Sequence, residues 1–87
     1  MEDVKVYVRA RRAPGGQETV LRGAMEAAGL GTRRMENRSG VSHQTIQNLR
    51  AGIGGVEIRK ADAIAKALGM PTVQLFAHAS EFAGDTL

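Results

Sequence analysis

The stretch Thr32–Gly52, TRRMENRSGVSHQTIQNLRAG, reads as two short helices joined by a sharp turn at residues 39–42. Gly40 offers the positive φ that such a turn needs at little cost, because glycine lacks a Cβ. Ser42 can cap the second helix, since its hydroxyl can accept a hydrogen bond from a backbone N–H of the first turn. The local chemistry therefore predicts a helix, a tight turn and a second helix.

The two helices are predicted to be apolar on one side and polar on the other. Four apolar residues can form a seam between them: Met35, Val41, Ile46 and Leu49. The opposite face of the second helix carries amide and imidazole side chains: His43, Gln44, Gln47 and Asn48. A helix that is apolar behind and amide-rich in front suits the major groove of DNA.

The wider segment GLGTRRMENRSGVSHQTIQNLRAG resembles the helix-turn-helix of the phage repressor and Cro-like family, also called the XRE family. The matching elements are Gly29-Leu30, Met35 in place of the usual Leu, Gly40-Val41-Ser42, Thr45-Ile46, Leu49 and Gly52. Downstream, KADAIAKALGMPTVQLF resembles the fourth and fifth helices of that family. The resemblance covers residues 19–77 and implies an all-α, five-helix DNA-binding domain.

The same alignment of motifs shows three departures. Thr32 stands where the family often has a phosphate-binding Gln, and Arg50 replaces a frequent Glu. Glu36 replaces a small residue, commonly Ala, at the point where the two helices meet. A carboxylate there is larger than the usual residue, so it could hinder the close approach of the two helices and could also repel phosphate.

The resemblance implies roles for particular side chains on DNA. Residues in the first turns of the second helix would reach base edges: His43, Gln44 and Gln47. Residues at the start of the first helix and on the second helix would contact the phosphate backbone: Thr32, Arg33, Arg34, Ser42 and Asn48. A Gln amide can donate and accept toward adenine at once, so readout of a base is within the chemistry of this helix.

Charge is distributed unevenly along a chain of formal charge +3. Residues 9–60 hold ten basic side chains (Arg9, Arg11, Arg12, Arg22, Arg33, Arg34, Arg38, Arg50, Arg59 and Lys60). Only four acidic ones lie among them (Glu18, Glu26, Glu36 and Glu57), which leaves a local balance of +6. A basic middle around a groove-reading motif is typical of a phosphate-binding protein, although a solvated basic surface would give the same count.

Composition bounds the class of protein. The chain has 87 residues, enough for one domain with a modest core, and 43% of them are hydrophobic but only 3% aromatic. That mix favours a helical bundle. With no cysteine, a disulfide framework and a thiolate metal site are excluded. No apolar run approaches the ~20 residues of a membrane span, and the start of the chain is unlike a signal peptide. A cytoplasmic protein without a membrane partner is expected.

The N-terminal segment alternates apolar and polar residues, the pattern of a strand with one apolar face. Val4, Val6 and Val8 form that face, and no second strand is evident elsewhere in the sequence. Two interpretations are open. The strand can pair antiparallel with its copy in a second protomer, giving a homodimer through these valines. Alternatively, the segment is a flexible arm that places three basic residues in the minor groove: Arg9, Arg11 and Arg12.

Three further helices are expected, over residues 18–28, 57–68 and 71–79, because apolar residues recur there at helical spacing. The predicted organisation is a strand or basic arm at 1–16, a helix-turn-helix domain at 17–79 and a polar tail at 80–87. In that tail Phe82 is the one anchor.

No enzymatic motif accompanies these elements. His43 and His78 fall in different predicted helices, and neither has a carboxylate pair placed with it. Metal, P-loop and serine-elbow signatures are missing from the sequence, so no catalytic residue, cofactor or metal is expected. The predicted function is sequence-specific binding of double-stranded DNA by a transcriptional regulator. A helix-turn-helix antitoxin, and an interaction module that has lost DNA binding, are the alternatives.

Overall fold

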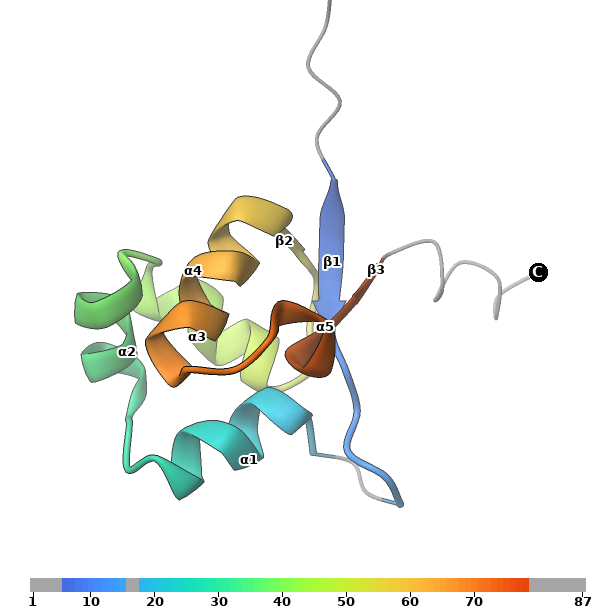
Figure 1. The fold of residues 1–87 in the computed structure, drawn as a ribbon, viewed down its shortest axis with the longest axis horizontal. Helices are drawn as coiled ribbons and strands as arrows, with labels where there is room; N and C mark the ends of the chain where they lie inside the picture. The colour runs from blue at the N-terminus through green and yellow to red at the C-terminus, as the bar shows by residue number, and fades with distance from the viewer. Residues whose placement is uncertain (1–5, 16–17, 79–87) are drawn as a thin grey trace, which may run out of the picture.

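The computed structural model describes residues 6–15 and 18–78. Their elements, in order, are β1 (Tyr7–Ala10), α1 (Val20–Ala27), α2 (Thr32–Ser39), α3 (His43–Arg50), β2 (Val56–Glu57), α4 (Ile58–Leu68), α5 (Thr72–Leu75) and β3 (Phe76–His78) (Figure 1). The five predicted helices are present, and a three-stranded antiparallel sheet accompanies them. The fold is therefore mostly helical with a small sheet at one end, rather than all-α.

Strand β1 is the centre of that sheet, whose order is β2-β1-β3. Val8 lies opposite Val56 on one edge and opposite His78 on the other. Gly55 is the residue before β2 and lies close to β1. A Cβ added to it would lie 2.8 Å from the carbonyl oxygen of Val8. The expectation that the chain holds no partner for this strand is wrong, because two short segments far along the chain pair with it.

This pairing removes the reason for expecting a dimer through Val4, Val6 and Val8. Strands of the same chain pair with β1 on both edges, β2 at residues 7–8 and β3 at residues 8–10, so β1 does not need a second protomer as its partner. Val8 is buried in the core at 4% exposure, and the carbonyl of Val6 accepts a hydrogen bond from the backbone N–H of Ile58 at 2.8 Å. Val4 lies outside the described residues.

Arg9, Arg11 and Arg12 do not form an arm separate from the folded domain, while their contact with the minor groove stays a prediction. Arg9 belongs to β1. Arg11 donates from its backbone N–H to the carbonyl of Leu75 at 2.9 Å and from Nε to the carbonyl of Val73 at 2.7 Å. Arg12 forms an antiparallel bridge with Thr19. These three arginines are therefore part of the folded domain.

The fifth helix is shorter than expected. It ends at Leu75, and Phe76 is extended, with φ −132° and ψ 146°, because the chain there becomes strand β3. His78 accordingly lies in a strand and not at the end of a helix, while Ala79, the last residue of the predicted helix, lies outside the described residues. The first helix begins at Val20, one residue after Thr19, whose side chain caps it.

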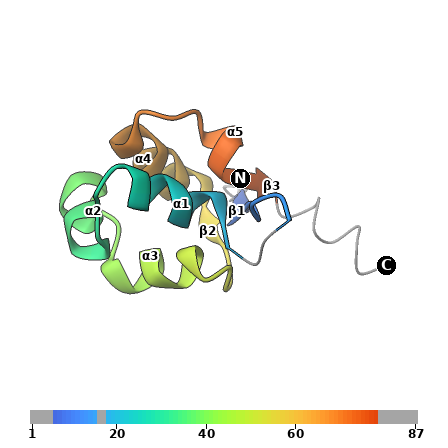
Figure 2. The ribbon, with the colours of Figure 1, turned by 90° about the horizontal axis from the view of Figure 1, so that it is seen from below.

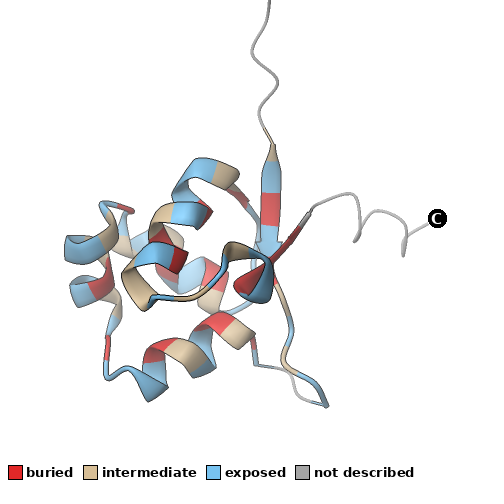
Figure 3. Ribbon diagram, in the orientation of Figure 1, coloured by how far each residue is buried: buried red, intermediate tan, exposed pale blue. Residues whose placement is uncertain are grey.

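One apolar core joins the helices to the sheet. The predicted seam between α2 and α3 is confirmed, since its four members have exposures of 0–3%: Met35, Val41, Ile46 and Leu49. Leu21 and Met25 of α1, Ile64 of α4 and Leu75 of α5 complete the centre of the core, each at 0%. Figure 3 shows buried positions spread over the helices and in β1.

The alternation along β1 offers a test of its role. Val8→Asp is expected to lower the free energy of unfolding by about 3 kcal/mol or more, because it buries an unpaired carboxylate. Tyr7→Asp is the control, since the neighbouring Tyr7 is 51% exposed and should lose about 1 kcal/mol or less. Urea denaturation followed by circular dichroism measures both. Equal losses would contradict a core role for the buried face of β1.

Candidate nucleic-acid interface

The turn between α2 and α3 is built as its residues predict. Gly40 ends α2 in the left-handed conformation, with φ 76°, and its backbone N–H donates to the carbonyl of Glu36 at 2.8 Å. Ser39 Oγ donates to the carbonyl of Met35 at 2.7 Å and accepts from the N–H of Val41 at 3.2 Å. Ser42 caps α3, since its Oγ accepts from the N–H of Gln44 at 3.2 Å. These bonds fix the angle between the two helices.

Glu36 strengthens this junction instead of disturbing it. Its Oε2 accepts from the backbone N–H of His43 at 3.1 Å, and its Oε1 lies 3.4 Å from Nδ1 of the His43 ring. A carboxylate at the start of α3 also interacts favourably with the partial positive charge of that helix end. The larger side chain at this position is therefore accommodated by a hydrogen bond across the turn. The spacing of residues within α2 alone does not predict that bond.

The polar face of α3 divides into two parts. Gln44, Gln47 and Asn48 are exposed, while His43 is half-buried. Gln44 Nε2 donates to Oδ1 of Asn48 at 3.5 Å, so these two amides lie together. Gln47 instead lines a hollow shared with α1. Figure 2 shows α3 along one side of the molecule, with α4 and α5 on the opposite side.

The start of α2 supplies the basic part of the surface. Arg33 and Arg34 are exposed, and Thr32 is half-buried as the first residue of the helix. Gly31 precedes the helix and provides no side-chain cap, and the first turn contains no acidic residue. Backbone N–H groups at an uncapped helix start, beside two guanidinium groups, suit a phosphate.

Arg22, in α1, and Arg50, the last residue of α3, are absent from the predicted contacts. Together with Gln47 and Ala51 they line a hollow of about 180 Å³. Arg22 belongs to α1, so its proximity to Gln47 and Arg50 arises only when the helices pack. Of the three departures from the XRE pattern, Arg50 is the one that lines this hollow, so it is the signal in the sequence that could have indicated the site.

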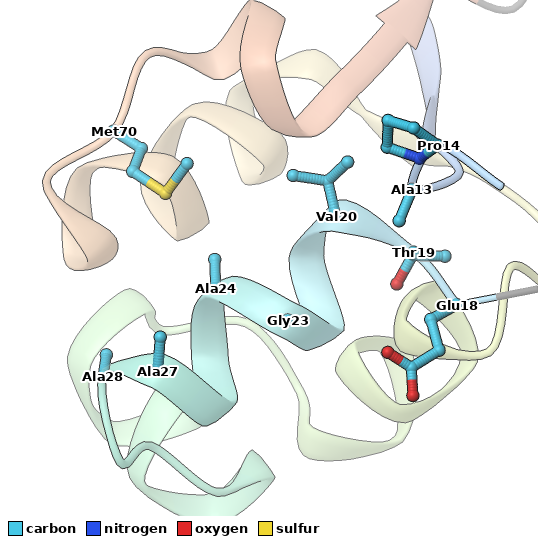
Figure 4. Close-up of a pocket in the computed structure, with 10 residues that line it drawn as sticks. All are labelled: Ala13, Pro14, Glu18, Thr19, Val20, Gly23, Ala24, Ala27, Ala28 and Met70. Atoms are coloured by element: carbon cyan, nitrogen blue, oxygen red, sulfur yellow. The ribbon is translucent and has the colours of Figure 1, made fainter. Parts of the chain in front are cut away.

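A second hollow, of about 650 Å³, is apolar and lies on another side of α1 (Figure 4). The side chains of Val20 and Ala24 point into it from α1, and Met70 lines it from the segment after α4. No residue of α3 lines it. Thr19 contributes one of its few polar groups, and that hydroxyl is already bonded to the backbone of Arg22 and Arg50.

The part of the chain that the structure describes contains no group of three or more His, Cys, Asp or Glu side chains placed to hold a metal ion. None of its helices combines the length and apolar character that crossing a membrane demands.

Replacing Glu36 tests the junction between α2 and α3. Glu36→Ala should lower the free energy of unfolding by about 1 kcal/mol, because it leaves a half-buried N–H at the start of α3 without its acceptor. Glu36→Gln keeps an acceptor oxygen and should recover part of that loss. Asn37→Ala is the control, since Asn37 is the exposed neighbour in α2 and should change stability by less than about 0.5 kcal/mol. Urea denaturation provides the measurement, and a Glu36→Ala variant as stable as the control would rule out the bond.

Comparisons of the chain with models of protein families, with curated proteins and with solved structures found no match. The functional proposal for this protein therefore rests on its own residues and their arrangement.

Proposed function

We propose that this protein binds double-stranded DNA sequence-specifically through α3 and acts as a transcriptional regulator of the repressor or Cro-like type. The observation that carries the proposal is the construction of α3. Its back, with Ile46 and Leu49, is fully buried, while Gln44 and Asn48 stand exposed and in contact on its front. A helix in the major groove needs such a rigid backing and such an amide-bearing front.

The surroundings of α3 are consistent with a polyanionic partner. Arg33 and Arg34 are exposed at the start of α2. This helix precedes the 39–42 turn and α3 in the chain. Phosphate contacts of this kind supply affinity and orientation, whereas base contacts supply specificity. The division of labour proposed for this surface is therefore phosphate binding by α2 and base readout by the first turns of α3.

A helix-turn-helix antitoxin is the alternative within the same class. Such a protein would need a second surface for a protein partner, and the apolar hollow beside α1 is the observation that favours it. An interaction module without DNA binding is the alternative from another class. It would show no salt-sensitive binding to duplex DNA at all, so titration of random duplex at two salt concentrations separates it from the other two.

Base readout is tested at Gln44. Gln44→Ala should cost about 1–3 kcal/mol on the best site and relax the preference at one base position, because the lost amide can bond both N6 and N7 of adenine. The site is first obtained by selecting bound sequences from a random DNA pool with the wild-type protein. Fluorescence anisotropy at fixed salt then compares that site with its single-base variants. Equal weakening on every sequence would make Gln44 a phosphate contact.

Phosphate contacts are tested at Arg33 and Arg34. Each change to Ala should weaken binding to all sequences alike and make the slope of log K against log salt shallower by about 0.9, the value for one phosphate contact on duplex DNA. Lys66→Ala is the control, since Lys66 is an exposed cation of α4, and α4 and α3 lie on opposite sides of the molecule in Figure 2. An unchanged slope for both arginine variants would remove α2 from the interface.

A further inference from the structure

The hollow between α1 and α3 is lined by unusual chemistry for the junction of two helices. Its four lining residues are Arg22, Gln47, Arg50 and Ala51, so two guanidinium groups and one amide line about 180 Å³, with no carboxylate among them. Guanidinium and amide N–H groups are hydrogen-bond donors. The lining is therefore suited to a ligand that carries negative charge and several acceptor oxygens.

A single buried side chain holds the two arginine backbones in place. Thr19, at 1% exposure, donates from Oγ1 to the carbonyl of Arg50 at 2.9 Å. The same oxygen accepts from the backbone N–H of Arg22 at 3.1 Å. Because one hydroxyl connects the start of α1 to the end of α3, the spacing of the arginine backbones is set by the fold.

The positive charge at this junction is only partly balanced by the described residues. Arg22 Nε lies 3.4 Å from Oε2 of Glu26, but both side chains are about half exposed, at 47% and 54%, so solvent screens the pair. Within residues 6–15 and 18–78, Arg50 has no ion pair with an acidic side chain. A cation is favourable in the last turn of α3, so the helix accounts for the presence of Arg50 there. It does not account for Arg22 in the same hollow.

The position of the hollow selects the anion. Gln47 is an exposed residue of α3, one turn beyond Gln44, so a helix lying in a groove would carry this hollow toward a flanking DNA strand. The planar guanidinium group matches phosphate oxygens with two parallel N–H bonds. We propose that Arg22, Gln47 and Arg50 form a clamp for one phosphate of the DNA backbone. Gln47 thereby positions α3 on the duplex and does not read a base.

This clamp rests on the proposed DNA binding, and its test separates the two. The duplex selected by the wild-type protein is titrated, at several salt concentrations, with the full-length chain and its Arg22→Gln, Arg50→Gln and Gln47→Ala variants. Each arginine variant should bind the selected and random duplexes about tenfold more weakly, with a salt slope shallower by about 0.9. Gln47→Ala should weaken both duplexes by the same factor and leave base preference unchanged. Lys66→Gln is the control for the loss of an exposed cation.

Charge reversal sharpens the test. Arg50→Glu places a carboxylate beside Arg22, so it should abolish the same single phosphate contact and make the slope shallower by about 0.9, as Arg50→Gln does, while weakening binding more than Arg50→Gln because the carboxylate repels the phosphate. Thermal unfolding by circular dichroism checks each variant. If a change at Arg50 prevents folding, Arg22→Gln decides the question, because that side chain is half exposed and only its backbone N–H is bonded to Thr19.

The outcomes distinguish two failures. A wild-type protein that shows no salt-sensitive binding to any duplex overturns the proposed function. A wild-type protein that binds, with folded Arg22→Gln and Arg50→Gln variants whose slopes equal that of Lys66→Gln, overturns the clamp alone. A base preference that changes in Gln47→Ala also overturns it, because Gln47 would then be a reading residue.

Discussion

The structure depends on the insertion of β1 between two strands that come from distant parts of the chain. A strand with buried residues must satisfy its backbone hydrogen bonds, and β1 does so with β2 on one edge and β3 on the other. Residues 7–10 thereby connect the segment before α4 to the segment after α5. Val8 and Ala10 add their side chains to the same core that backs the helices. Residues 7–10 are thus an integral part of the domain.

A second constraint acts at the junction of α2 and α3. The turn itself needs only Gly40 and Ser42, but the orientation of α3 also depends on the bond from the N–H of His43 to Glu36. A helix that reads a groove must keep its exposed side chains in a fixed direction. The combination of a buried apolar back and a bonded first turn provides that rigidity, and it gives Glu36 a structural part in the proposed function.

The basic surface is similarly organised by packing between helices. Arg33 and Arg34 are neighbours in the chain, whereas Arg22 and Arg50 come from different helices and line one hollow, where Thr19 bonds to the backbone of both. Two cations side by side are unfavourable unless a partner with negative charge offsets them. Glu26 offsets part of this charge at Arg22, and in a protein proposed to bind DNA a phosphate of the duplex would offset the rest.

The sequence by itself determined the helix-turn-helix, because its signals are local: a glycine for positive φ, a serine cap and apolar residues three or four positions apart. The tertiary structure decided the rest. Strands of two and three residues are too short to show the apolar–polar alternation by which a strand is predicted. Strands β2 and β3 form by pairing with β1, and β3 ends α5 early. The Glu36–His43 bond crosses a turn, and the hollow that Arg22 and Arg50 line lies between two helices. Contacts between residues so far apart depend on the packed core, which no short window of sequence encodes.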